Sequence, residues 1–227
     1  FINKAFASGA KFVVTDKKFN KTNKKEKILL VENTFTFLKE LSIKKRSLYG
    51  GQVIGITGSA GKTTLKESLK FYLEKKFIVS ASIKSYNNNL GVMISILNMN
   101  INSRFAIFEI GTNNFFEIRD LTNLVKPSQI FISNIMSAHL ENFKSKKNIV
   151  LEKSDIFQKK YNPLAKTLYF QKNSREEVLI SDIAKKQKLK NIISIGKKGV
   201  DCYIKNITYN KSSYKINFKI LNKNFKI

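Results

Sequence analysis

VIGITGSAGKTTLKESL, residues 53–69, places an apolar run before a glycine-containing turn and an amphipathic segment after that turn. The apolar run predicts a strand at 53–57, and the spacing of the later apolar residues predicts a helix at 62–74. Gly58 and Gly61 allow the tight backbone turn that must connect the two elements. A strand, a glycine turn and a helix in this order are typical of a loop that binds phosphate groups.

In such a loop, backbone N–H groups point toward the phosphates, and the helix N-terminus adds partial positive charge. Lys62 would reach the terminal phosphates of a nucleotide, and Thr63 would place its hydroxyl on Mg²⁺. The usual spacing has a glycine five residues before Gly61, where this chain has Ile56. An ordinary strand-to-helix turn is the alternative, but it leaves the Gly-Lys-Thr sequence unexplained. The expected phosphate-binding residues are Gly58, Ser59, Ala60, Gly61, Lys62, Thr63 and Thr64.

Short apolar runs alternate with amphipathic segments along most of the chain. This alternation predicts an α/β fold with a mainly parallel sheet flanked by helices on both faces. The expected strands are 53–57, 77–80, 105–110, 129–135, 192–195, 203–209 and 214–221. The expected helices are 62–74, 90–97, 115–125, 149–160 and 174–186. The residues expected on the apolar face of the helix at 62–74 are Leu65, Leu69, Tyr72 and Leu73.

The first part of the chain predicts a separate, smaller α/β unit. Its expected elements are a helix at 1–8, strands at 11–15 and 28–31, and a helix at 34–44. Charged residues and two glycines in 44–51 indicate a domain boundary, which divides the chain into 1–46 and 47–227. Because the first residue is Phe1 and lies inside an expected helix, we expect the chain to be part of a longer one.

Two further residues that could bind a ligand follow expected strands. Glu109 lies at the end of the strand at 105–110, where the crevice of a parallel sheet binds ligands and a carboxylate can hold Mg²⁺. The alternative is a solvated glutamate at a strand end. His139, the only histidine, would by itself suggest a structural or surface role. Because it follows the strand at 129–135, we expect it at the same sheet edge as the phosphate loop.

Lys153 falls on the apolar stripe of the helix expected at 149–160, together with Ile149, Ile156 and Phe157. Lysines usually avoid such a stripe. One interpretation is a buried aliphatic stem with its ammonium in water. The other is a desolvated amine with a lowered pKa. The spacing of the residues leaves both open.

Composition limits the other possibilities. With 227 residues and 42% hydrophobic content, the chain is long enough for a good core, and no run approaches the roughly 18 apolar residues of a membrane span. The start lacks the pattern of a signal peptide, so we expect a cytoplasmic protein without membrane insertion. The net charge of +26 comes from scattered lysines in a chain that is also rich in Asn, Ile and Phe, which indicates compositional bias rather than a specific nucleic-acid site. The single Cys202 is expected to be an inert, half-buried thiol.

Four segments together resemble the Mur ligases of peptidoglycan synthesis: ITGSAGKTTLKE (56–67), SYNNNLGVMISIL (85–97), FAIFEIGTNNFFEIRDLTNLVKP (105–127) and ISNIMSAHLENFKSKKNIVLEKSDIF (132–157). Residues 109–113 and the Asn-rich turn before Gly91 resemble most closely the member that joins D-alanyl-D-alanine to a UDP-N-acetylmuramoyl tripeptide. The resemblance implies an ATP- and Mg²⁺-dependent ligase, and residues 1–46 resemble the end of the family's uridine-nucleotide domain.

The resemblance also implies roles for single residues. Gly58 to Thr64 would hold the ATP phosphates, with Lys62 catalytic, and Thr63 and Glu109 would bind one Mg²⁺. His139 and Lys153 would act at a second metal ion, with Lys153 carbamylated as in many members of the family. Asn88 and Asn89 correspond to contacts with the substrate.

Several departures from the family pattern and several alternatives remain. Asn142 replaces a frequent glycine, 167–177 lacks the usual Asn-Ala-Asp stretch, and the C-terminal ligase domain would follow residue 227. We therefore expect residues 1–227 alone to be inactive in ligation, and we expect a monomer. One alternative is another Mur ligase or a folylpolyglutamate synthetase-like ligase. The other is a non-catalytic nucleotide or nucleic-acid binder, which would bind DNA with a steep dependence on salt.

Overall fold

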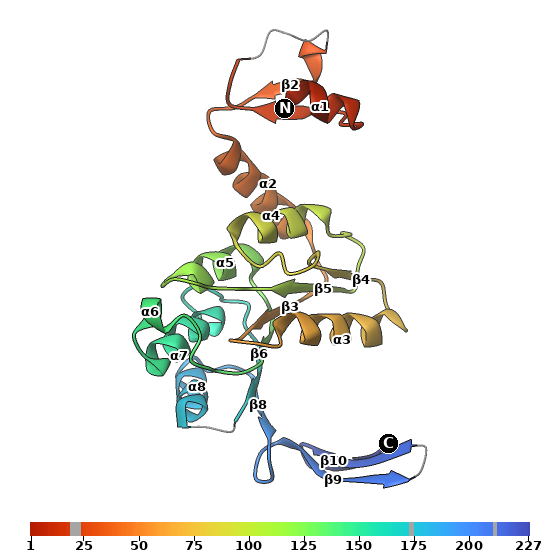
Figure 1. Cartoon of the computed structure of the whole chain (residues 1–227), viewed down its shortest axis with the longest axis vertical. Coiled ribbons are helices and arrows are strands. Elements are labelled where there is room, and N and C mark those ends of the chain that lie inside the picture. Colours follow the sequence, from red (N-terminus) through yellow and green to blue (C-terminus); the bar gives the residue numbers. More distant parts are fainter. Residues whose placement is uncertain (19–23, 173–174, 211–212) are drawn as a thin grey trace.

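The computed structural model describes residues 1–18, 24–172, 175–210 and 213–227. Within these residues, nine strands form one sheet in the order β11-β10-β9-β8-β7-β6-β3-β5-β4. The strands from β4 to β9 pair in parallel, whereas β9, β10 and β11 pair antiparallel. This confirms the mainly parallel sheet expected from the sequence (Figure 1). The strands are β3 (Gln52–Thr57), β4 (Val79–Ala81), β5 (Phe105–Glu109), β6 (Gln129–Ile132), β7 (Thr167–Gln171), β8 (Asn191–Gly196), β9 (Cys202–Asn210), β10 (Ser213–Ile220) and β11 (Lys223–Lys226).

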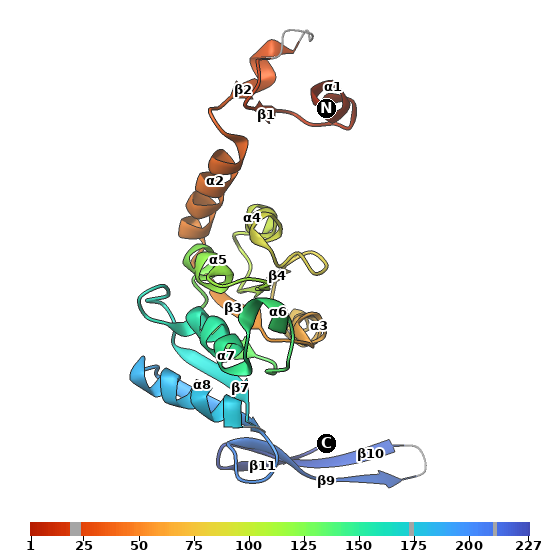
Figure 2. The same cartoon turned by 60° about the vertical axis from the view of Figure 1, so that its left-hand side comes forward.

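Helices cover both faces of the parallel part of the sheet, as Figures 1 and 2 show from two sides. Helix α3 packs on one face, and α4, α5, α7 and α8 contribute buried residues to the larger core on the other. Among the described residues, no helix is long and apolar enough to cross a membrane. The helices that follow β2 are α2 (Thr34–Leu48), α3 (Lys62–Glu74), α4 (Asn89–Asn98), α5 (Glu117–Val125), α6 (Leu140–Phe143), α7 (Lys146–Ser154), the 3-10 helix η2 (Asp155–Phe157) and α8 (Arg175–Lys186).

The two cores follow from the alternation of side chains along the strands. Ile54 and Ile56 of β3 point to the face covered by α3, whereas Val53 points to the opposite face. On the neighbouring strand, Ile107 belongs to the first cluster and Phe108 to the second. Because both faces of these central strands are buried, their sequences are almost entirely apolar, which is why the strands were predictable.

One expectation about α3 was wrong. Leu65, Leu69 and Leu73 pack against the sheet, but Tyr72 is 67% exposed. The side chain of α3 that is fully buried is instead Lys66. The spacing of apolar residues predicts which side of a helix is buried, but it does not predict which residues at the edges of that side are exposed.

The N-terminal part forms a small α/β unit, with a parallel pair of strands drawn at the top of Figure 1. Helix α2 continues past the boundary expected between residues 46 and 47, and it packs on α4 and α5. The guanidinium of Arg46 donates to the carbonyl of Val125 at 2.6 Å. The division into 1–46 and 47–227 therefore stays a prediction. The elements before α2 are α1 (Ile2–Ala7), β1 (Val13–Thr15), η1 (Lys25–Lys27) and β2 (Ile28–Leu30).

Other elements differ from the expected ranges at their ends. Strand β6 stops at Ile132 rather than at residue 135, and the residues after it form a loop. Helix α7 begins at Lys146, and it is followed by a 3-10 turn instead of continuing to residue 160. The expected helix start at Ser174 lies outside the described residues. Strand β11 was not expected, and Cys202 is half-buried as expected.

Candidate nucleotide and metal site

The chemistry-bearing residues gather at the carboxyl ends of three adjacent strands. Strand β3 lies between β5 and β6 and is parallel to both. After β3 the chain crosses to β4 at one edge of the sheet. After β6 it crosses to β7, which lies on the opposite side of β3. Such a change of direction opens a crevice at the carboxyl edge of a parallel sheet. The expected phosphate loop, residues 58–64, lies at this crevice.

The phosphate loop depends on its two glycines. Gly58 has a φ of +146° and Gly61 has a φ of +77°, and Gly61 is the N-cap of α3. A Cβ atom at Gly58 would overlap the hydroxyl of Ser133, whereas the space around Gly61 is open. The positive φ angles therefore favour glycine at both positions. At position 58 a side chain would also collide with Ser133, so glycine is needed there for a second reason.

The loop after β6 holds the phosphate loop in place. The N–H of Ser59 donates to the carbonyl of Asn134 at 3.0 Å, and the N–H of Ala60 donates to the Asn134 side chain at 2.9 Å. The Ser133 hydroxyl donates to the carbonyl of Ala60 at 2.6 Å. The first-turn N–H groups of α3 have no acceptor four residues before them in the helix. The loop is thus fixed in position while these donors stay available for an anion.

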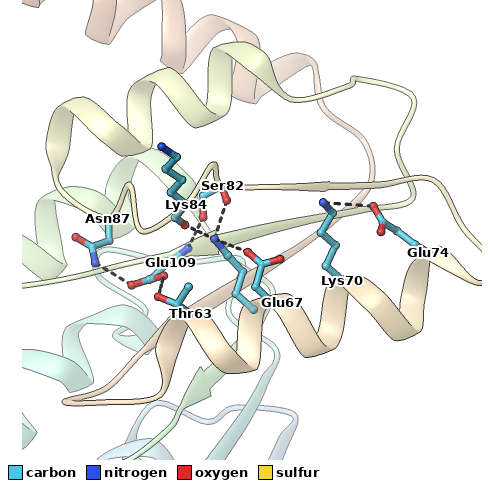
Figure 3. Close-up of polar contacts among 9 residues, drawn as sticks. Thr63, Glu67, Lys70, Glu74, Ser82, Lys84, Asn87 and Glu109 are labelled. Carbon is cyan, nitrogen blue, oxygen red and sulfur yellow. Dashed lines mark hydrogen bonds and ion pairs between the residues drawn. The ribbon is translucent and has the colours of Figure 1, made fainter.

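Glu109 is buried beside Thr63, as Figure 3 shows. The Thr63 hydroxyl donates to Glu109 Oε2 at 2.8 Å, and Asn87 Nδ2 donates to Glu109 Oε1 at 2.8 Å. The backbone N–H of Glu109 donates to the hydroxyl of Ser82 at 3.2 Å. With only 1% of its surface exposed, Glu109 is not a solvated residue at a strand end.

The Thr63–Glu109 pair fits a magnesium ion. Mg²⁺ prefers oxygen ligands and usually keeps several waters, so one or two protein oxygens together with phosphate oxygens suffice. A hydroxyl and a carboxylate oxygen already lie 2.8 Å apart here. Within the described ranges, no group of three His, Cys, Asp or Glu side chains could hold a metal.

Lys62, His139 and Lys153 line one small cavity together with Gly58 and Ser59. Lys62 Nζ donates to the carbonyl of Gly58 at 3.0 Å. Burial lowers the pKa of Lys62, and the nearby carboxylate of Glu109 offsets part of this effect. His139 is exposed, has a φ of +55°, and is the N-cap residue of α6. The structure thus brings these three predicted residues together.

Lys153 on α7 is buried, with only 4% of its surface exposed. Burial and, to a lesser extent, the positive charge of Lys62 lower its pKa to about 8, although Glu152 opposes this shift. The Glu152 carboxylate, also buried, accepts from the N–H groups of Phe116 and Ile118 at 2.7 and 2.9 Å. Of the two interpretations left open by the sequence, the structure matches the desolvated amine.

The lowered pKa gives a prediction for stability. Between about pH 8 and 10.5, the unfolded chain binds a proton at Lys153 that the folded chain has lost, so this group makes stability rise with pH in that window. Lys153→Met should remove the rise and stabilise the folded chain below pH 8 by roughly 3 kcal/mol at most. Urea unfolding from pH 7 to 10, in buffer free of bicarbonate, measures this. Lys147→Met, at an exposed position of the same helix, is the control. Identical pH profiles for both variants would contradict the desolvated amine.

A larger pocket of about 520 Å³ opens beside the phosphate loop. Asn88 and Asn89 line it as expected, together with Lys62 and His139. The side chain of Asn88 also accepts from the N–H of Gly91 at 2.8 Å and so caps α4. Two residues of the site were missed: Asn87, which orients Glu109, and Glu152, which neighbours Lys153. No spacing in the Asn run distinguished Asn87 from its neighbours.

Comparisons with known proteins place the chain in one family. Residues 56–227 match the family described as Mur ligase middle domain. A UDP-N-acetylmuramoyl-tripeptide--D-alanyl-D-alanine ligase of Rickettsia prowazekii is 41% identical over 158 residues, which cover 70% of this chain and 35% of the relative. The structure of a MurF ligase of Thermotoga maritima in complex with ADP superposes with a TM-score of 0.79 at 27% identity, and covers 100% of this chain and 51% of that one.

A MurF structure from Acinetobacter baumannii has a TM-score of 0.81 at 24% identity, covers 100% of this chain and 48% of that one, and supports the fold alone. The chain spans about a third of the length of the curated relatives that it matches. The family match nevertheless covers most of its 227 residues. Because this match covers more than half of the chain, the chain belongs to the Mur ligase family.

Proposed function

We propose that this chain is the ATP-binding core of a ligase that joins D-alanyl-D-alanine to UDP-N-acetylmuramoyl-tripeptide. The observation that carries the proposal is the convergence of the phosphate loop, Glu109, His139 and Lys153 around one crevice. The specific reaction is supported by the name of the Rickettsia prowazekii relative and by names printed for other relatives. The ADP complex of the Thermotoga maritima relative supports ATP as the nucleotide.

In the proposed reaction, a carboxylate oxygen of the tripeptide attacks the γ-phosphorus of ATP, and ADP leaves. The amine of D-alanyl-D-alanine then attacks the acyl carbon, and phosphate leaves. Both partners of the first step are anionic, so their repulsion must be screened. Lys62 and the N–H groups of residues 61–64 would bind the phosphates and stabilise the charge that develops during transfer.

Thr63 and Glu109 would hold Mg²⁺ at the phosphates. The ion supplies positive charge that neutralises the phosphate oxygens during transfer. Asn87 and Ser82 would keep Glu109 oriented, because each already forms a hydrogen bond with it. The substrate side of the site would be the 520 Å³ pocket, where Asn88 and Asn89 lie.

Lys153 would act as a carbamate near a second metal ion that His139 contacts. Carbamylation joins a neutral amine to CO₂ and releases a proton, so a pKa of about 8 favours it by raising the neutral fraction near neutral pH. The product is an anion, and Lys62 on the same cavity would stabilise it. The role of Lys153 as a metal ligand therefore belongs to this proposal.

The remaining expectations belong to the same proposal. Residues 1–46 would be the end of a uridine-nucleotide domain, and residues 47–227 would form the ATP-binding domain. We place the reaction in the cytoplasm, where ATP and a nucleotide-linked precursor are available. The protein would act as a monomer.

Release of phosphate by the complete protein that carries this chain tests the proposal. We expect release only when ATP, Mg²⁺, the UDP-linked tripeptide and D-alanyl-D-alanine are all present. Release with D-glutamate or a diamino acid as the acceptor, and not with D-alanyl-D-alanine, would overturn the assignment in favour of a sibling ligase. Tight, salt-sensitive DNA binding without substrate-dependent release would indicate a nucleic-acid binder instead.

A further inference from the structure

Lys66 is a buried charge that the proposed reaction does not use. It lies on α3, three residues after Thr63, and its side chain is 0% exposed. Its ammonium donates to the carbonyls of Ser82, at 2.8 Å, and of Lys84. Its acidic partner is Glu67 at 3.1 Å, whose side chain is 55% exposed (Figure 3). An ammonium without access to water is costly unless such partners satisfy it, so its position calls for a specific reason.

The two carbonyls belong to the segment that connects β4 to α4. This segment makes a tight turn, because Lys84 has a φ of +48°. Ser82 at its start accepts from the N–H of Glu109, and Asn87 at its end donates to the Glu109 carboxylate. Ser82 therefore contacts Lys66 through its carbonyl and Glu109 through its hydroxyl, while Lys84 contacts Lys66 and Asn87 contacts Glu109. We refer to residues 82–87 as the clamp segment.

Helix α3 places Thr63 and Lys66 on the same side, because residues three apart are neighbours on a helix surface. Thr63 reaches Glu109 directly, and Lys66 reaches the clamp segment that holds Glu109. In Figure 3, Thr63, Glu109 and Asn87 lie together between α3 and the clamp segment. Lys66 thus connects the helix that follows the phosphate loop to the segment that orients the expected metal ligand.

We propose that Lys66 is a positioning residue whose buried ammonium fixes the clamp segment against α3, so that Asn87 and Ser82 hold Glu109 in the orientation that binds Mg²⁺. This inference rests on the proposed nucleotide and metal site. It assigns to Lys66 no contact with substrate, because the side chain is enclosed. Loss of the ammonium would leave two carbonyls without their donor and would release the segment that carries Asn87.

The test compares Lys66→Met with Lys70→Met in the full chain. Lys70 lies one turn further along α3, is partly exposed, and pairs with Glu74 at 3.8 Å, so it is a matched control (Figure 3). Calorimetric titration with ATP at a series of Mg²⁺ concentrations gives the Mg²⁺ concentration that half-saturates nucleotide binding. We expect Lys66→Met to raise this half-saturating Mg²⁺ concentration about tenfold, which is the effect of losing one charged hydrogen bond. Lys70→Met should leave this concentration unchanged. ATP binding without Mg²⁺ should change less than about twofold in both, because the phosphate loop is intact.

Hydrogen exchange provides a readout that does not depend on the nucleotide. The amides of the clamp segment should exchange faster in Lys66→Met than in Lys70→Met, with β6 unchanged. If Lys66→Met does not fold, Lys66→Gln keeps one donor and should give an intermediate Mg²⁺ requirement. An unchanged requirement in a folded Lys66 variant overturns the inference, even if its melting temperature falls. If the unchanged chain binds no Mg²⁺-nucleotide, the proposed function fails instead, and exchange of the clamp segment still decides the role of Lys66.

Discussion

Lys62→Ala is expected to lower substrate-dependent ATP turnover by the complete protein roughly 100- to 1000-fold, the scale of removing one preorganised donor from a developing charge. The ammonium is held at the phosphate loop by the carbonyl of Gly58, so its charge is already in place before the nucleotide binds. It is also partly desolvated, which strengthens its attraction to phosphate oxygens. Phosphate release measures the effect, and Lys70→Ala on the same helix is the control.

The same variant has a second consequence. The charge of Lys62 lowers the pKa of Lys153, so the pKa of Lys153 should rise when Lys62 is removed. The rise in stability with pH that Lys153 causes should then begin at a higher pH. The variant should still fold, because burying the charged ammonium of Lys62 is unfavourable and the alanine variant has no such charge to bury. Turnover close to that of the unchanged protein would show that Lys62 does not hold the transferred phosphate.

Glu109→Gln is expected to weaken Mg²⁺ binding in the nucleotide complex at least about 100-fold, beyond the usual effect of losing a residue that only orients a metal ligand. The carboxylate accepts from both Thr63 and Asn87, one on each oxygen. An amide replaces one of these oxygens with an N–H₂ group, which can donate to the Thr63 hydroxyl but cannot bind a metal ion. A negative ligand is lost at the same time.

Titration of turnover with Mg²⁺ measures the effect of Glu109→Gln. A large part of the activity should return at high Mg²⁺ concentrations, because the phosphate loop still binds the nucleotide. Glu74→Gln, on the exposed part of α3, is the control. A turnover loss that Mg²⁺ does not relieve would indicate a damaged fold rather than a lost metal ligand, and normal turnover would exclude Glu109 from the metal site.

The central sheet and the glycine turn between β3 and α3 were predictable because their signals are local. The helix at 62–74 begins and ends where the glycine turn and the apolar spacing indicated. The sequence predicted that strand β6 would continue to residue 135, but the strand ends at Ile132. Residues 133–135 instead belong to the loop whose Asn134 carbonyl accepts from the N–H of Ser59. Local sequence does not record such a tertiary contact.

The polar half of the site was only partly predictable. Glu109 was found because it ends a strand, whereas Asn87 lies in a run of three asparagines whose individual roles depend on the turn before α4. Lys66 was missed because a lysine between apolar helix positions suggests a solvated face, and the carbonyls that satisfy it are 16 and 18 residues away in sequence. The burial of Lys153 likewise depends on the packing of α7 beside the phosphate loop.

The most direct test is a crystal structure of this chain with Mg²⁺ and a non-hydrolysable ATP analogue. We expect the β- and γ-phosphates on the N–H groups of residues 61–64, with Lys62 at the γ-phosphate and Mg²⁺ bound by the Thr63 hydroxyl and Glu109. Phosphates bound elsewhere, or a Mg²⁺ ion that contacts neither Thr63 nor Glu109, would contradict the proposed site.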